Sequence, residues 1–240
     1  MSVIDVRRNS TRQRTDIGWL DSRHSFSFGR HYDPGNTHFG LLLVSNDDRI
    51  APSTGFDTHP HRDMEIVTWV LDGAIVHQDS EGNSGIITPG LAQRMSAGTG
   101  IRHSERNDGR GGDGTHFVQM WVPPDTDRVR PSYAESNVTA ELDGGGWVPV
   151  ASGRGHDAAI AIRQRDAVLW ATRLAAGESL PLPTSRYAHA YVARGTVDLE
   201  GAGRLAEGDA ARVTGSEGQR VTAGDRGAEL LVWEMHSTLR

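Results

Sequence analysis

Short runs of β-branched and aromatic residues, separated by glycines and prolines, recur along the chain. Residues 66–71 form one such run, Asp72-Gly73 is a two-residue turn signal, and an apolar pattern resumes over residues 74–77. Together they predict a β-hairpin over residues 66–77. No segment carries a long helical apolar period with capping signals, so we expect only short helical pieces, one of them near residues 131–137. Glycines with the spacing of tight turns between short strands are Gly82, Gly85, Gly90, Gly98 and Gly100. The pattern favours an all-β barrel or sandwich.

The chain also repeats its own pattern. Gly55 and Gly73 lie eighteen residues apart, and so do Gly177 and Gly195. A shift of 118 positions aligns Gly90, Ala92, Arg94, Gly100 and Arg102 with Gly208, Ala210, Arg212, Gly218 and Arg220 without a gap. Chance matching in a glycine-rich chain is the alternative, but the regular order favours two copies of one β unit. We therefore expect one unit in residues 1–130, and a Pro- and Gly-rich connector followed by the second unit in residues 131–240.

Two short clusters of polar residues carry the candidate chemistry. His59 and His61 are two residues apart, as are His103 and Glu105, so each pair shares one face of a strand. If the two strands face each other, three imidazoles and one carboxylate converge. Divalent Fe, Mn, Co, Ni, Cu and Zn accept such a ligand set, with positions left open for substrate when the ion is octahedral. A lone histidine is more often a surface or hydrogen-bonded residue, but burying four polar groups together is costly unless something coordinates them.

The second copy lacks these groups, because its matching positions are Pro181, Pro183, Val221 and Ala223. Eight of the eleven histidines also lie before residue 120. A single metal site in the first copy is therefore expected. Histidines without a comparable partner spacing, for which we expect surface or hydrogen-bonded positions, include His24, His31, His38, His77 and His116.

Composition narrows the chemistry further. The chain has no cysteine, and all 25 of its basic residues are arginine, which excludes disulfides, thiolate nucleophiles, iron–sulfur clusters and lysine-based catalysis. A net charge of −6 and only a short basic run near the N-terminus argue against nucleic-acid binding. Neither a signal peptide nor a membrane-spanning run of about 18 apolar residues is found, so no membrane association and a cytoplasmic location are expected.

The motifs resemble the pirin family of the cupin superfamily. The similarity is carried by residues 59–65 (His-Pro-His-Arg-Asp-Met-Glu), by residues 71–73 and by residues 95–105 (Met-Ser-Ala-Gly-Thr-Gly-Ile-Arg-His-Ser-Glu), and also by residues 19–28. It spans nearly all of residues 15–125, whereas the C-terminal half is similar mainly in its layout. The resemblance implies a bicupin, two double-stranded β-helix (jelly-roll) barrels in one chain, with one metal site in the N-terminal barrel. It makes His59, His61, His103 and Glu105 the ligands.

The same resemblance implies an activity. Bacterial pirins similar to this chain act on flavonols such as quercetin as 2,3-dioxygenases, with iron or another divalent metal. We therefore expect a monomer that binds one divalent ion, iron(II) before Mn, Co, Ni, Cu or Zn, and that takes a flavonol and O2 as substrates. Glu105 would accept the flavonol's hydroxyl proton. The alternatives are a non-enzymatic metal-binding regulator that acts through protein partners, and a sugar isomerase, which the absence of lysine makes less natural.

Glu65 is a second candidate for the carboxylate ligand. In many cupins the glutamate four residues after His-x-His binds the metal, and its odd number would place Glu65 on the face of His59 and His61. The pirin pattern instead takes the carboxylate from Glu105, so we assign Glu105 to the metal and expect Glu65 to orient a ligand imidazole. Apolar residues that could wall a cavity, with core packing as the alternative, are Phe26, Phe28, Phe56 and Trp69.

Overall fold

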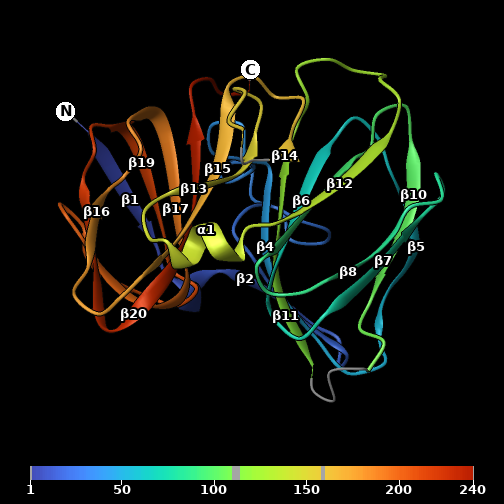
Figure 1. Cartoon of the computed structure of the whole chain (residues 1–240), viewed down its shortest axis with the longest axis horizontal. Coiled ribbons are helices and arrows are strands. Elements are labelled where there is room, and N and C mark those ends of the chain that lie inside the picture. The colour runs from blue at the N-terminus through green and yellow to red at the C-terminus, as the bar shows by residue number, and fades with distance from the viewer. Residues whose placement is uncertain (1, 110–113, 158–159, 240) are drawn as a thin grey trace.

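The computed structural model describes residues 2–109, 114–157 and 160–239. It consists of two β-rich halves side by side, with the cyan and green strands of the first half separated from the orange and red strands of the second (Figure 1). Over the described residues, the helical elements are one 3-10 turn (Asn9–Thr11) and one short helix, α1 (Thr139–Asp143). The predicted all-β fold is confirmed. No helix in these ranges is long and apolar enough to cross a membrane.

The first half is built from two sheets that face each other. One has seven strands in the order β12-β9-β6-β11-β4-β3-β2, and the other has four in the order β5-β10-β7-β8. Its strands are β2 (Gln13–Asp16), β3 (Leu20–His24), β4 (Val44–Ile50), β5 (Gly55–His61), β6 (Glu65–Asp72), β7 (Ile75–Asp79), β8 (Ser84–Ile87), β9 (Leu91–Ser96), β10 (Ile101–Arg106), β11 (Thr115–Val122) and β12 (Ser132–Asn137).

The second half forms one nine-stranded sheet. Its main path is β1-β19-β17-β20-β15-β13-β14, while β16 pairs with β20 and β18 with β17. The strands are β1 (Val3–Arg7), β13 (Val148–Ser152), β14 (Ile160–Ala161), β15 (Ala167–Leu174), β16 (Ser179–Pro181), β17 (Ser185–Leu199), β18 (Gly203–Ala206), β19 (Ala210–Ser216) and β20 (Arg220–Met235).

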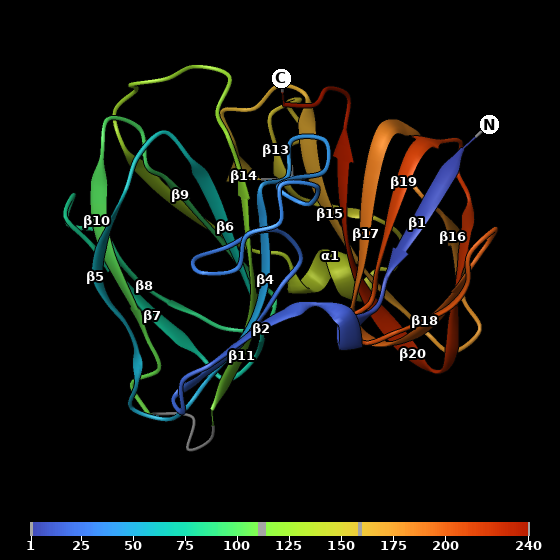
Figure 2. The same ribbon diagram turned by 180° about the vertical axis from the view of Figure 1, so that it is seen from behind.

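The two copies have matching strand neighbours. In the first, β6 lies between β9 and β11, and in the second, β17 lies between β19 and β20. Pairing also crosses between the ends of the two segments, because the N-terminal β1 adds to β19 (Figure 2) and β12 adds to β9. The domain boundary at residue 130 therefore stays a prediction. Strand β12 follows that boundary in the sequence, but it pairs with β9 and so belongs to the sheet of the first half.

Strand β6 is buried on both faces, which explains its near-continuous apolar sequence. Val67, Trp69 and Leu71 belong to a core cluster that they share with Leu231, Trp233 and other residues of the second half. Val70, on the opposite face, packs inside the first barrel in a different cluster. Successive side chains alternate between these two environments, as the pleat of a strand requires.

The predicted hairpin over residues 66–77 is wrong in its pairing. Gly73 does make the expected turn with φ +75°, but β6 and β7 join different sheets. The turn is therefore a corner of the barrel. Gly195, its counterpart in the repeat, also has a positive φ of +76°, but it lies at a register shift within the continuous strand β17, where an added Cβ would lie 2.2 Å from the carbonyl oxygen of Gly227.

The helix expected near residues 131–137 is also wrong, because Ser132–Asn137 is strand β12, which pairs antiparallel with β9. The only α-helix in the described ranges begins at Thr139. There the side chain of Asn137 accepts a hydrogen bond from the Thr139 backbone N–H at 3.0 Å. The polar residues after Pro131 thus end a strand and start the helix after it.

Candidate functional site

Three of the predicted ligands face one another across two neighbouring strands. Strands β5 and β10 pair antiparallel with His103 directly opposite His59, and His61 lies on the same face two residues further along β5. The ring centroids are 4.4 Å apart for His59 and His103, 4.8 Å for His59 and His61, and 4.9 Å for His61 and His103. The alternation predicted from the two His clusters therefore brings the imidazoles together.

The free nitrogens of these rings suit a metal ion. One ligand atom from each of the three histidines lies within 4.8 Å of the other two. The Nε2 atoms of His61 and His103 are buried and have no hydrogen-bond partner among the described residues. His59 Nδ1 lies 2.8 Å from the carbonyl oxygen of Asp57, so this nitrogen donates and Nε2 is left as the acceptor. Buried acceptors without donors are unfavourable, and coordination to a cation would satisfy them.

Burial also keeps the cluster in its ligating form. It lowers the pKa of His61 to about 4, assisted by the neighbouring His103 and His59. The pKa of His103 is lowered to about 3 by burial and by His59 and His77. Both imidazoles are therefore neutral near pH 7, and a neutral imidazole is the form that binds a metal.

Glu105 lies beside the histidines. One of its oxygens is 4.0 Å from His103 Nε2, and it forms a second compact group with His103 and His77. Gln119 Nε2 donates to both Glu105 oxygens, at 2.9 and 2.8 Å, and the Thr68 hydroxyl lies 3.4 Å from one of them. These donors orient the carboxylate in a site where it is only 2% exposed.

Glu65, in contrast, is not part of the cluster, so its predicted place beside His59 and His61 is wrong. Strand β5 ends at His61, the chain turns through Asp63 at φ +45°, and Glu65 begins β6 in the other sheet. Its carboxylate accepts hydrogen bonds from the Ser96 hydroxyl at 2.8 Å and from the Arg163 backbone at 3.2 Å. The alternation of a strand does not extend past a turn, so the odd number carried no information.

These positions predict different effects for the two glutamates. Glu105→Gln should weaken metal binding by more than about 100-fold, because it removes a charged candidate ligand, whereas changes to outer groups cost about 10–100-fold. Glu65→Gln should bind metal as the wild type does, since Gln can still accept from Ser96. Isothermal titration of the metal-free proteins with iron(II) or nickel(II) measures both. The reverse order of affinities would contradict the assignment of Glu105.

His77 is a contributor that sequence reasoning missed. It is fully buried, with its Nδ1 atom 3.4 Å from Nδ1 of His103 and its Nε2 atom 3.3 Å from a carboxylate oxygen of Asp79. This chain of contacts fixes the ring of His103 so that Nε2 is the atom directed to the cluster. The sequence did contain a signal, because His77 and Asp79 are two residues apart on one strand face.

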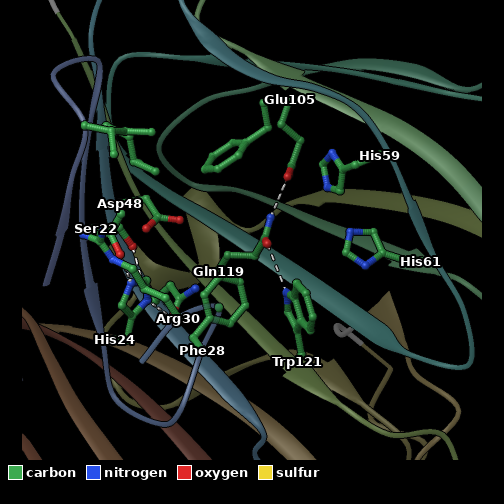
Figure 3. A pocket seen from close by; sticks show the side chains of 16 residues that line it. Ser22, His24, Phe28, Arg30, Asp48, His59, His61, Glu105, Gln119 and Trp121 are labelled. Carbon is green, nitrogen blue, oxygen red and sulfur yellow. Dashed lines mark hydrogen bonds between the residues drawn. The ribbon is translucent and has the colours of Figure 1, made fainter. Parts of the chain in front are cut away.

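His59 and His61 open onto a cavity of about 460 Å³ in the first barrel. Figure 3 shows its lining, with His59 and His61 on one side, Glu105 and Gln119 between, and Asp48, Ser22 and His24 on the opposite side. Of the predicted wall residues, Phe28 and Phe56 line it. Phe26 and Trp69 do not, and are buried in the core shared by the two halves.

Trp121 is a wall residue that the sequence reasoning did not select. Its ring meets that of His61 edge-on with centroids 4.9 Å apart, and its Nε1 donates to Gln119 Oε1 at 3.0 Å. Gln119 and Trp121 are two residues apart on β11 and therefore share one face of the strand, which is why both reach the cavity.

The corresponding place in the second barrel is filled by apolar side chains. Val221 and Leu182 are 1% and 2% exposed, and Val221 pairs with Leu180 where β16 meets β20. Together with the prolines at Pro181 and Pro183, this packing leaves no polar group in the positions of the histidines. The single-site interpretation therefore fits both copies.

Comparison with known proteins identifies the family. The pirin model matches residues 6–122, and the model for the quercetinase C-terminal cupin domain matches residues 149–235. A Mycobacterium tuberculosis protein named "Putative quercetin 2,3-dioxygenase" is 54% identical over 239 residues, or 99% of this chain and 97% of that protein. The Escherichia coli protein named "Quercetin 2,3-dioxygenase" is 46% identical over 138 residues, or 58% of this chain and 59% of that one.

Solved structures agree. The crystal structure of YhhW from Escherichia coli is 33% identical, with a TM-score of 0.88 over 99% of this chain and 100% of that one. A second crystal structure, of the bacterial pirin YhhW in complex with nickel(II), has the same identity and coverage and a TM-score of 0.87. The predicted bicupin fold is confirmed, and the chain belongs to the pirin family of the cupin superfamily.

Proposed function

We propose that the protein is a metal-dependent dioxygenase that cleaves flavonols such as quercetin and releases carbon monoxide. His59, His61, His103 and Glu105 would hold one divalent ion, with iron(II) as the first choice. The observation that carries the proposal is the group of imidazoles with unpartnered Nε2 atoms at one end of a cavity with aromatic walls. The relatives named as quercetin 2,3-dioxygenases support the choice of reaction.

Each residue of the site would have a distinct task. When bound, the ion would supply Lewis acidity that makes a substrate hydroxyl more acidic, and a centre at which the flavonol and O2 meet. Glu105 would accept the hydroxyl proton on a carboxylate oxygen, while Gln119 keeps that carboxylate oriented through its two hydrogen bonds. Phe28, Phe56 and Trp121 would hold the flat rings and exclude water.

The test measures quercetin, O2 and carbon monoxide in the same reaction. Iron(II)-loaded protein should consume one O2 and release one carbon monoxide for each quercetin that disappears, followed by an oxygen electrode, gas analysis and flavonol absorbance. His61→Ala should lose the activity, whereas His236→Ala, which removes a partly exposed histidine of the second barrel, should retain it. Forms loaded with manganese, cobalt, nickel and copper are assayed in parallel. Bound metal with no turnover in any form would favour the regulatory alternative.

A further inference from the structure

The cavity has polar groups at both ends. His59 and His61 lie on one side, and Figure 3 places Asp48, Ser22 and His24 on the other. Strand β4 supplies Asp48 and strand β3 supplies Ser22, and the two residues are opposite each other in the register of these strands. Aromatic walls separate the two ends, so the cavity suits a flat molecule that is polar at both.

Most polar groups at the second end already have partners within the protein. His24 Nδ1 lies 2.9 Å from Asn46 Oδ1, and His24 Nε2 lies 2.9 Å from the Thr15 hydroxyl. Of all residues that line the cavity, only two have a buried side-chain atom without a hydrogen-bond partner in the described structure: His61 with Nε2, and Asp48 with Oδ1. The first belongs to the metal cluster. The second is unexplained by it.

Asp48 is 4% exposed, so water does not readily satisfy the free oxygen. Burial raises the pKa of Asp48 to about 7, the hydrogen bond from Ser22 opposes this rise, and the charges of Asp47 and Glu105 add to it. A hydrogen-bond donor that enters the cavity would stabilise this buried carboxyl group, because one of its oxygens has no partner within the protein. The neighbouring carboxylates of Asp47 and Glu105 disfavour an added anion beside Asp48, whereas a neutral hydroxyl is suitable.

We propose that Asp48 accepts a hydrogen bond from a substrate hydroxyl at the end of the molecule away from the histidine cluster. The cavity thereby selects polyhydroxylated aromatic substrates over those that carry only the reacting hydroxyl. This inference rests on the proposed function and deepens it. A site built to bind a hydroxyl discriminates strongly against an analogue without one, because the protein's buried oxygen is then left unpaired.

Three flavonols test the selection. Quercetin has hydroxyls on both outer rings, galangin lacks those of the B ring, and 3-hydroxyflavone keeps only the reacting hydroxyl. Asp48→Ala should raise the KM for quercetin by about 10–100-fold with kcat changed less than about threefold, and should leave the KM for 3-hydroxyflavone unchanged. Asp48→Asn, whose amide oxygen still accepts, should give an intermediate KM. If Asp48→Ala raises the KM for galangin as it does for quercetin, the hydroxyl bound by Asp48 is not on the B ring. If the KM for galangin stays unchanged, that hydroxyl is on the B ring.

Two controls separate this proposal from loss of structure and from failure of the proposed function. Glu65→Gln removes another buried carboxylate of the same barrel and should leave the ratio of the two KM values as in the wild type. Dissociation constants for quercetin and 3-hydroxyflavone, from quenching of tryptophan fluorescence without oxygen, give the same comparison without turnover. If no flavonol is cleaved but binding still discriminates through Asp48, the dioxygenase proposal fails and the hydroxyl site stands. Equal effects of Asp48→Ala on both flavonols, or none on either, would overturn the hydroxyl site.

Discussion

The double variant His59→Ala/His103→Ala should lose stoichiometric metal binding and flavonol cleavage together. These residues lie opposite each other on β5 and β10, and their removal leaves only His61 and Glu105 at the proposed site. Metal affinity should fall by more than about 100-fold, since even changes to outer groups cost about 10–100-fold. Elemental analysis after dialysis should find about one equivalent of metal in the wild type and almost none in the variant.

A stability measurement gives an independent readout of the same loss. Metal at about 1,000 times its dissociation constant should raise the unfolding free energy of the wild type by about 4 kcal/mol and that of the double variant by almost nothing. His156→Ala/His236→Ala removes two imidazoles from the second half and should bind metal normally. If the first double variant kept a full equivalent of metal, the single site in the N-terminal barrel would be refuted.

The sequence predicted the histidine cluster because its geometry is local to each strand. A strand alternates its side chains every second residue, so His59 with His61, and His103 with Glu105, had to share faces. The same rule failed for Glu65 because a turn intervenes after His61. The rule describes one strand and gives no information about residues beyond a bend.

The turn residues likewise predicted where the chain turns, but not which sheet the next strand joins. Asp72-Gly73 has the composition of a hairpin, and Gly73 adopts the left-handed conformation that such a turn needs. Whether the next strand folds back on the last one or crosses to another sheet depends on long-range packing. In this protein β6 is buried between two partners, β9 and β11, so β7 is excluded from its edges.

The cavity residues were the hardest to predict, because a strand with two buried faces does not reveal which face meets the cavity. Trp69 and Trp121 both lie on buried strands, yet Trp69 faces the second half and Trp121 the cavity. Asp47 and Asp48 are neighbours on β4, and their side chains likewise point to opposite faces of the strand. Asp48 lines the cavity, whereas Asp47 reaches across to the second half. Only the packing of the two halves distinguishes them.

The second large effect is expected on the stability of the protein when Asp47 is replaced. Its carboxylate accepts a hydrogen bond from His116 Nε2 at 2.8 Å and another from the Tyr191 hydroxyl of the second half, with the Arg12 guanidinium 4.0 Å away. Asp47→Ala should lower the unfolding free energy by about 3–5 kcal/mol, because it leaves buried partners without an acceptor. Tyr191→Phe removes one hydroxyl and should cost only about 1 kcal/mol. Urea unfolding measures both, and equal losses would contradict a network centred on Asp47.

The same carboxylate should make stability depend on acid pH. Burial alone would raise the pKa of Asp47, but the hydrogen bond and charge of His116, with the charge of Arg12, outweigh it and hold the pKa at about 2. Because this value lies below the ordinary 3.8, the stabilisation is present above about pH 4 and is lost as the pH falls toward 2. The difference corresponds to about 2 kcal/mol. Asp47→Asn cannot titrate, so the stability gap between wild type and Asp47→Asn should narrow by about that amount between pH 5 and pH 2. A gap that stays constant with pH would show that the charge of Asp47 does not stabilise the contact between the two halves.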